Sequence, residues 1–177
     1  GVLSIVDYPG FEDLDAPDME SYSKALNAGQ YPLSVLALSE SCAQSYRRGL
    51  YGNTMSSNPR AMDVGVAVLG SLNDELRNNI TERGRELLTG LAALTDETDG
   101  AVVSAQGTGL LLSCELDRRY KIHGTESTED YLRRIGLAVI HGGEHSLRYT
   151  PVFDLSQKEV ELIVSLTRQG LLEGPTH

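Results

Sequence analysis

The order in which helical and strand-like hydrophobic patterns alternate after residue 70 is the strongest constraint on the fold. Leucine and isoleucine residues recur at spacings of three and four up to Leu94, which predicts an amphipathic helix. Helices are also expected at about 127–135 and 156–169. Four short strands are expected, at 101–105, 110–116, 138–140 and 146–150. The resulting order of helix, two strands, helix, two strands, helix predicts a compact α+β unit with helices on one face of a small sheet.

The first 70 residues follow a less regular pattern. Two short apolar segments, at 19–23 and 31–39, are joined by a tight connection in which Gly29 is free to adopt a positive φ. A helix is expected to begin at Asn58-Pro59, because Asn is a good cap and Pro is favoured at the first helical position. One face of this helix carries the apolar residues Met62, Val66 and Leu69.

Charge and cysteine content limit the classes of function. The 177 residues include 15 Lys plus Arg against 25 Asp plus Glu, a formal net charge of −10. This balance argues against a nucleic acid or an anionic membrane as partner, because both favour clustered Lys and Arg. The only cysteines are Cys42 and Cys114, which fits a reducing compartment. Since the chain has no membrane-length apolar run and no signal-peptide pattern, a soluble cytoplasmic protein is expected.

Lysine is rare in this chain, and Lys24 has the most informative surroundings of the three. It lies between the two apolar segments, directly before the turn that contains Gly29, which is typical of a strand end beside a cleft. Partial loss of solvent at such a place favours the neutral amine, which is a nucleophile. An isolated lysine is more often a solvated surface charge, so the position alone leaves both interpretations open.

A second informative segment, 51–62, places Thr54 just upstream of the helix start at Asn58-Pro59. A hydroxyl and backbone N–H groups in such a place are able to bind a phosphate. The alternative is an ordinary loop followed by a capped helix, which the local pattern alone favours.

Together the two segments resemble those of class III aminotransferases of the ornithine and acetylornithine type, which are fold-type I pyridoxal-phosphate enzymes. Residues 17–33 follow that family's order of Pro-Asp, lysine, a turn of small residues, Pro and a strand, and 51–62 is similar to its Thr-x-x-x-Asn-Pro-x-Ala stretch. The resemblance implies that Lys24 forms the internal aldimine with pyridoxal 5'-phosphate. It also implies that Thr54 binds the cofactor phosphate of the neighbouring subunit, and hence a homodimer whose active site is shared across the interface.

Two further strings lie in the expected strands of the second part. Residues 145–151 are similar to the family's Leu-Arg-Phe-x-Pro-Pro segment, whose arginine grips the amino-acid α-carboxylate, so the resemblance assigns this role to Arg148. A guanidinium suits that task because it donates two parallel hydrogen bonds. At Gln106 the family usually has the arginine of an Arg-Gly-x-Gly-Leu string. Glutamine keeps the hydrogen-bonding capacity but lacks the charge.

His141, Glu144 and His145 lie close together in the sequence and raise the alternative of a metal site. Their segment has glycine-driven turn character and no further acidic or Cys residue at ligand spacing. We therefore expect no metal and interpret the segment as a turn near the substrate entrance.

The resemblance extends over essentially the whole chain but corresponds to only the second half of such an enzyme. The family's glycine/serine phosphate loop, its ring-stacking aromatic residue and the aspartate that pairs with the pyridine nitrogen have no counterpart here. Asp7 lies too close to Pro17-Asp18 to be that aspartate. Because Gly1 leads directly into an apolar run without a Met, the chain is expected to be a piece of a longer protein.

The resemblance thus implies an α/β protein of fold type I, in which 1–70 is the end of the large cofactor-binding domain and 71–177 is the small α+β domain. The implied function is transfer of an amino group between an amino acid or ω-amine donor and a 2-oxo acid. An aminomutase, a decarboxylase or a racemase of the same fold is an alternative, because those reactions use the same lysine and cofactor. A non-catalytic α+β assembly domain is the alternative from another class.

Overall fold

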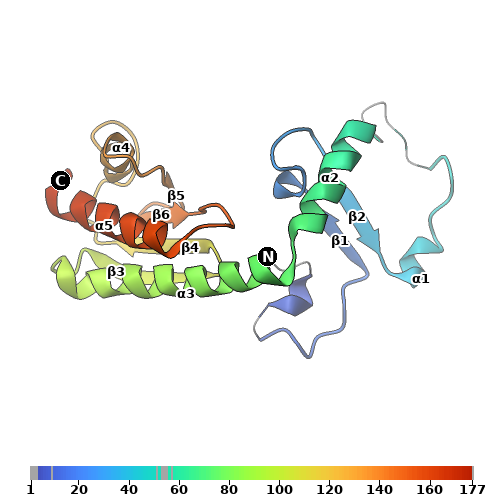
Figure 1. The fold of residues 1–177 in the computed structure, drawn as a ribbon, viewed down its shortest axis with the longest axis horizontal. Coiled ribbons are helices and arrows are strands. Elements are labelled where there is room, and N and C mark those ends of the chain that lie inside the picture. Colours follow the sequence, from blue (N-terminus) through green and yellow to red (C-terminus); the bar gives the residue numbers. More distant parts are fainter. Residues whose placement is uncertain (1–3, 9, 51, 53–55, 57, 177) are drawn as a thin grey trace. The chain divides into compact units, whose positions relative to one another are not determined.

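The computed structural model describes residues 4–8, 10–50, 52, 56 and 58–176 of the chain. The chain divides into two compact units, Gly1–Asn73 and Asp74–His177 (Figure 1). None of the helices in the described part of the chain is long and apolar enough to cross a membrane.

The first unit is built around a two-stranded antiparallel sheet. Strands β1 (Met19–Tyr22) and β2 (Val35–Leu38) pair with Met19 opposite Leu38. Between them lies the 3-10 helix η2 (Lys24–Asn27), so the expected tight connection contains a helical turn of its own. The 3-10 helix η1 (Ile5–Asp7) precedes the sheet, and the short helix α1 (Glu40–Ala43) follows it.

Helix α2 (Pro59–Ser71) completes the first unit and begins where the sequence predicts. The Asn58 side chain accepts a hydrogen bond from the Arg60 N–H at 3.1 Å, and Pro59 occupies the first helical position. The residues that α2 buries are small, Ala61 and Gly65. Three of its larger apolar residues remain exposed in this chain, at 46% for Met62, 71% for Val66 and 47% for Leu69.

The helical pattern that continues past residue 70 belongs to a separate helix, α3 (Asp74–Glu97). A competing side chain explains the break. The Ser71 hydroxyl donates to the Val68 carbonyl at 2.7 Å, the carbonyl to which the N–H of Leu72 would donate in a continuing α-helix. The Leu72 N–H donates to the Leu69 carbonyl instead, in a tighter turn that ends α2.

The second unit has the predicted order of elements. After α3 come β3 (Val102–Thr108), β4 (Leu111–Leu116), α4 (Thr128–Arg134), β5 (Ile140–His141), β6 (Ser146–Tyr149) and α5 (Gln157–Glu173). The predicted capping box is present at the start of α5, where Ser156 and Glu159 exchange hydrogen bonds. Helix α5 runs four residues further than predicted, and β5 is shorter and lies later.

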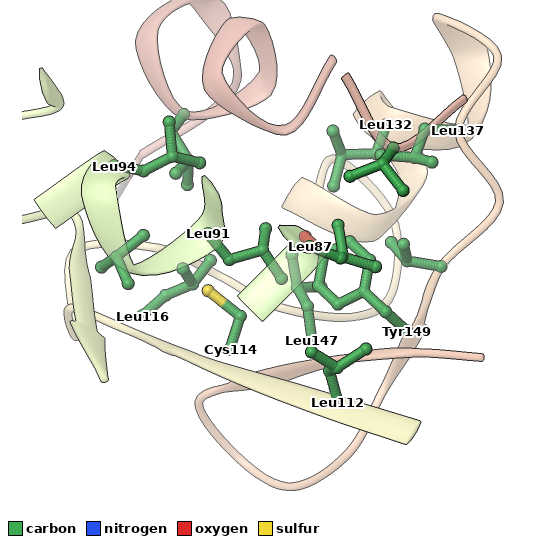
Figure 2. Packing of buried hydrophobic residues seen from close by; sticks show 14 of the residues in the cluster. Leu87, Leu91, Leu94, Leu112, Cys114, Leu116, Leu132, Leu137, Leu147 and Tyr149 are labelled. Carbon is green, nitrogen blue, oxygen red and sulfur yellow. The ribbon is translucent and has the colours of Figure 1, made fainter. Parts of the chain in front are cut away.

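The four strands form one antiparallel sheet in the order β3-β4-β6-β5. Burial alternates along β4 and β6, which shows that one face of the sheet is covered and the other is open. The buried side chains of these strands pack with leucines of α3 in the core of this unit (Figure 2). The labelled members of this core are Leu87, Leu91, Leu94, Leu112, Cys114, Leu116, Leu132, Leu137, Leu147 and Tyr149.

Helix α3 approaches the β3–β4 turn so closely that only glycine fits at the contact. A Cβ added at Gly84 would overlap the carbonyl oxygen of Gly109. Gly109 itself has a φ of 55°, in the left-handed region that the turn requires. This contact holds the long helix against the turn that follows Gln106.

Candidate functional site

Lys24 lies in a strained turn directly after β1. Its φ is 54°, in the left-handed region that is unfavourable for a residue with a Cβ by roughly 1–2 kcal/mol. Ala28, which caps η2, has a φ of 47°, and Gly29 has a φ of 70°. Left-handed backbone at non-glycine residues concentrates at functional sites, where the surrounding structure holds it in place.

The side chain of Lys24 is exposed in this chain. Among the described residues, Lys24 has no carboxylate within 4 Å and no hydrogen-bond partner for its amine. The described residues therefore do not bury this lysine, although the sequence analysis expected partial burial. Its amine is accessible to a ligand.

Asn27 holds the lysine-bearing turn against helix α2. Its side chain is almost fully buried, with 1% exposed. The amide Nδ2 donates to the carbonyl of Ala61 at 2.6 Å, and Oδ1 accepts from the N–H of Tyr31 at 2.6 Å. The sequence analysis missed this residue. The sequence feature that could have revealed it is a single polar residue, Asn27, among alanines and a glycine, three positions after the lysine. The amide of such a residue is able to close a turn.

Thr54, the expected phosphate ligand, lies outside the described residues. The role of Thr54 stays a prediction.

Arg148 lies on β6 between Leu147 and Tyr149, which are buried, and is itself exposed. It therefore projects from the open face of the sheet of the second unit. Within the described part of the chain, no carboxylate lies within 4 Å of its guanidinium. Lys24 belongs to the first unit and Arg148 to the second.

Gln106 and Arg148 belong to one cross-strand row of that sheet. Gln106 pairs with Ser113 on β4, and Ser113 pairs with Arg148 on β6. Directly paired residues point to the same face, and with strands about 4.8 Å apart the Cα atoms of Gln106 and Arg148 are about 10 Å apart. Gln106, where the sequence departs from the family pattern, thus lies on the same face of the sheet as Arg148, the residue expected to bind the substrate carboxylate.

A carboxylate on this open face is held away from Arg148. Glu115 lies on β4 two residues beyond Ser113, which places it diagonally across from Arg148. Its Oε2 accepts a hydrogen bond from the Ser104 hydroxyl at 3.0 Å. Arg148 is consequently available for a carboxylate from outside the described residues.

His141, in the segment that also contains Glu144 and His145, is hydrogen-bonded to Glu129 of helix α4. The Nδ1 of His141 is 2.9 Å from the Glu129 carboxylate, and the backbone N–H of His141 donates to the same oxygen at 3.2 Å. Burial raises the pKa of the Glu129 carboxyl, but hydrogen bonds from His141 and Arg133 outweigh it and hold this pKa below its ordinary value. Among the described residues, no group of three or more His, Cys, Asp and Glu side chains is arranged to hold a metal ion.

Comparisons with known proteins identify the family of this chain. The sequence model of the family described as aminotransferase class-III matches residues 11–169. Acetylornithine aminotransferase from Neisseria meningitidis serogroup B is 32% identical over 145 residues, which are 81% of this chain and 36% of that protein. Acetylornithine aminotransferase from Synechocystis is 27% identical and aligns with 92% of this chain and 38% of that protein.

Solved structures show the same fold. The crystal structure of acetylornithine aminotransferase from Elizabethkingia anophelis superposes with a TM-score of 0.81 at 24% identity, covering 92% of this chain and 42% of that one. The predicted fold class, α/β of fold type I, is thereby confirmed. The chain spans well under half the length of the relatives it matches. Since the family match extends over most of its residues, this chain belongs to the class III aminotransferases.

Proposed function

We propose that the complete protein is a pyridoxal-phosphate-dependent aminotransferase that transfers an amino group between an amino acid or ω-amine donor and a 2-oxo acid. The observation that carries the proposal is Lys24, whose accessible amine lies in a strained turn within the region matched by the family. The relatives named acetylornithine aminotransferase support the same activity.

Among the described residues, Lys24 has the chemistry that this cofactor needs. Pyridoxal phosphate carries an aldehyde, which needs an accessible amine, and Lys24 offers one on a turn that Asn27 anchors. When bound, the cofactor supplies an electron sink for the carbanion formed at the substrate Cα. Thr54 is the residue we propose for its phosphate.

Lys24 has two tasks in this proposal. With pyridoxal phosphate bound, its Nζ would be the amine that holds the cofactor in the resting enzyme. During turnover, the same Nζ would act as the base that takes the proton from the substrate Cα and as the acid that gives it back. An exposed turn directly after a strand suits this, because the side chain must detach and move while its backbone stays fixed.

Arg148 is proposed to bind the carboxylate of the amino acid and of the 2-oxo acid. The support is its exposure on the open sheet face and the separation of Glu115 from it by the Ser104 hydrogen bond. A planar guanidinium holds a carboxylate by two parallel hydrogen bonds, which also orients the substrate.

The unit division supports our proposal that residues 1–70 end a large cofactor-binding domain and that 71–177 form a small domain. On the first unit, apolar side chains of β2 and α2 are exposed in this chain, among them Leu36 and Val66. Exposed apolar patches mark surfaces that another part of a protein covers. We further propose a homodimer that shares its active sites, with Thr54 acting across the interface, and a cytoplasmic location in keeping with the two free cysteines.

The test is reduction of the complete protein with borohydride in the presence of pyridoxal phosphate, followed by peptide mapping. We expect the label on Lys24, with Lys121 and Lys158 as internal controls. Label on either control residue would refute the role of Lys24. Product analysis then separates the alternatives. An aminotransferase moves the donor's amino group to the 2-oxo acid one for one, whereas an aminomutase, a decarboxylase or a racemase gives a different product, and an assembly domain gives none.

A further inference from the structure

The turn that carries Lys24 has few internal bonds to fix its shape. We define the lysine turn as residues 23–31. Within it, three backbone N–H groups donate to carbonyls three residues earlier: Leu26 to Ser23 at a long 3.3 Å, Ala28 to Ala25 at 3.0 Å and Gln30 to Asn27 at 2.9 Å. Left-handed backbone at Lys24 and Ala28 costs free energy at both ends of η2. Contacts from elsewhere must therefore hold this conformation.

Asn27 supplies the contact to helix α2, while the Ser23 hydroxyl bonds to the strand side, at Leu33 and Ser34. Asn27 is the single buried residue of the lysine turn, and its amide group bonds in two directions. The bond from Nδ2 to Ala61 attaches the turn to α2, and the bond to Oδ1 from Tyr31 closes the turn on itself. Burying an amide without partners is costly, so these bonds oppose alternative positions of the turn.

The surface of α2 is shaped to receive the turn. Ala61, whose carbonyl accepts the bond, is itself 1% exposed. At Gly65, one helical turn further on, a Cβ would come within 2.9 Å of Leu33 Cδ2 and 3.8 Å of the Leu26 carbonyl. The small residues on this side of α2 therefore leave room for the lysine turn at Ala61 and for Leu33, which follows the turn, at Gly65.

We propose that Asn27 is a positioning residue for Lys24, and that its bond to the Ala61 carbonyl sets where the lysine amine stands relative to helix α2. This inference rests on the proposed role of Lys24. In this proposal, Asn27 touches neither the substrate nor the cofactor. The amine must reach both the cofactor and the substrate Cα, and a misplacement of about 1 Å at such a centre costs up to a hundredfold in rate.

Asn27→Asp in the complete protein separates the two bonds. The introduced carboxylate still accepts from the N–H of Tyr31, but it has no proton to donate to Ala61. Burial beside a carbonyl oxygen raises the pKa of the introduced carboxyl, so the protonated fraction of this group increases as the pH falls. That form donates to Ala61 again. Asn27→Ala removes both bonds at every pH.

We expect both variants at pH 8 to lower kcat by about ten- to a hundredfold, with KM changed less than about threefold. Between pH 8 and 6, kcat relative to wild type should recover in Asn27→Asp and not in Asn27→Ala. The rate at which borohydride and pyridoxal phosphate label Lys24 in the cofactor-free protein should fall in parallel. Asn27→Asp is nearly isosteric, so it carries the test alone if Asn27→Ala does not fold.

Thr98→Val is the matched control. Thr98 is a buried polar residue of the second unit whose hydroxyl donates to the Leu94 carbonyl, so its loss destabilises the protein without removing any hydrogen bond of the lysine turn. We expect a lower Tm with unchanged kcat per bound cofactor. Unchanged kcat per bound cofactor in both Asn27 variants, or no recovery of Asn27→Asp at low pH, would overturn the inference. Absence of label on Lys24 in the wild type would instead refute the proposed function.

Discussion

Gln106 and Arg148 face the same side of the sheet in the second unit, one on each side of Ser113. The row therefore joins a neutral amide and a guanidinium across a small hydroxyl residue. An arginine in place of Gln106 would give the same row two positive charges. The glutamine leaves Arg148 as the cation of this row.

Gln106→Arg should change which acceptors the enzyme prefers. A second guanidinium in the row should lower KM for 2-oxo acids with two carboxylates by about five- to tenfold, because a charge-assisted hydrogen bond contributes about 1.5–3 kcal/mol before solvent screening. KM for acceptors with one carboxylate should change less than about twofold. Steady-state kinetics with both acceptor types measures this.

Thr108→Arg adds the same charge on the same strand, two residues away, and serves as the control. If it lowers KM as much as Gln106→Arg does, the effect is general electrostatic attraction and not recognition within the row.

Arg148→Lys should penalise substrates by their carboxylate. Lysine retains the charge but lacks the planar fork, so specificity for an amino acid and its 2-oxo acid should fall by about ten- to a hundredfold. The half-reaction with the corresponding decarboxylated amine should be spared. Equal losses for the amino acid and the amine, at unchanged cofactor content, would show that Arg148 is structural.

Thr54→Ala should weaken retention of pyridoxal phosphate by about ten- to a hundredfold, because a hydrogen bond to a charged phosphate contributes about 1.5–3 kcal/mol. Equilibrium dialysis of the cofactor measures the change, and circular dichroism checks that the fold is intact. Thr54→Ser keeps the hydroxyl and should retain the cofactor nearly as well as wild type. A Thr54→Ala protein with wild-type retention would remove this residue from the phosphate site.

Gly84→Ala should destabilise the second unit by about 1–3 kcal/mol, since the added methyl overlaps the Gly109 carbonyl and backbone cannot yield cheaply. Gly70→Ala is the control, because it makes the same substitution at a helical glycine without a close contact. A Cβ at Gly70 meets nothing within 4 Å, and alanine is the better helix former, so this change should be neutral or stabilising. Thermal unfolding followed by circular dichroism compares the two. A Gly84→Ala protein as stable as wild type would contradict the close contact.

The thiol of Cys114 should not react with thiol reagents in the folded protein. Burial raises its pKa from 9.0 to about 12, so at pH 8 its thiolate fraction is roughly a thousandfold below that of an ordinary thiol. Labelling with a thiol reagent should therefore modify Cys42, which is half-buried, before Cys114. Labelling of Cys114 should rise with denaturant in step with unfolding. Prompt modification of Cys114 in the native protein would mean that the core opens locally.

Much of the second unit could be predicted because its signals are local. The three- and four-residue spacing of leucines defines α3, alternation defines β4 and β6, and the Ser156–Glu159 box defines the start of α5. The end of α2 was missed because it depends on the hydroxyl of Ser71, which competes for a carbonyl without disturbing the hydrophobic pattern. The exposure of Val66 was also not foreseen, because periodicity shows which residues share a face but not what covers that face.

The sequence by itself determined the family, the candidate residues Lys24, Thr54 and Arg148, and the departure at Gln106, because residue types at characteristic spacings carry that information without any knowledge of distance. Tertiary structure alone decided that Asn27 anchors the lysine turn to Ala61, 34 residues away, and that Gln106 and Arg148, 42 residues apart in the sequence, share a row. The physical reason is that a buried amide finds its partner, and a strand its register, only when segments distant in sequence pack together. That packing depends on the free energy of the whole unit and not on any short string of residues.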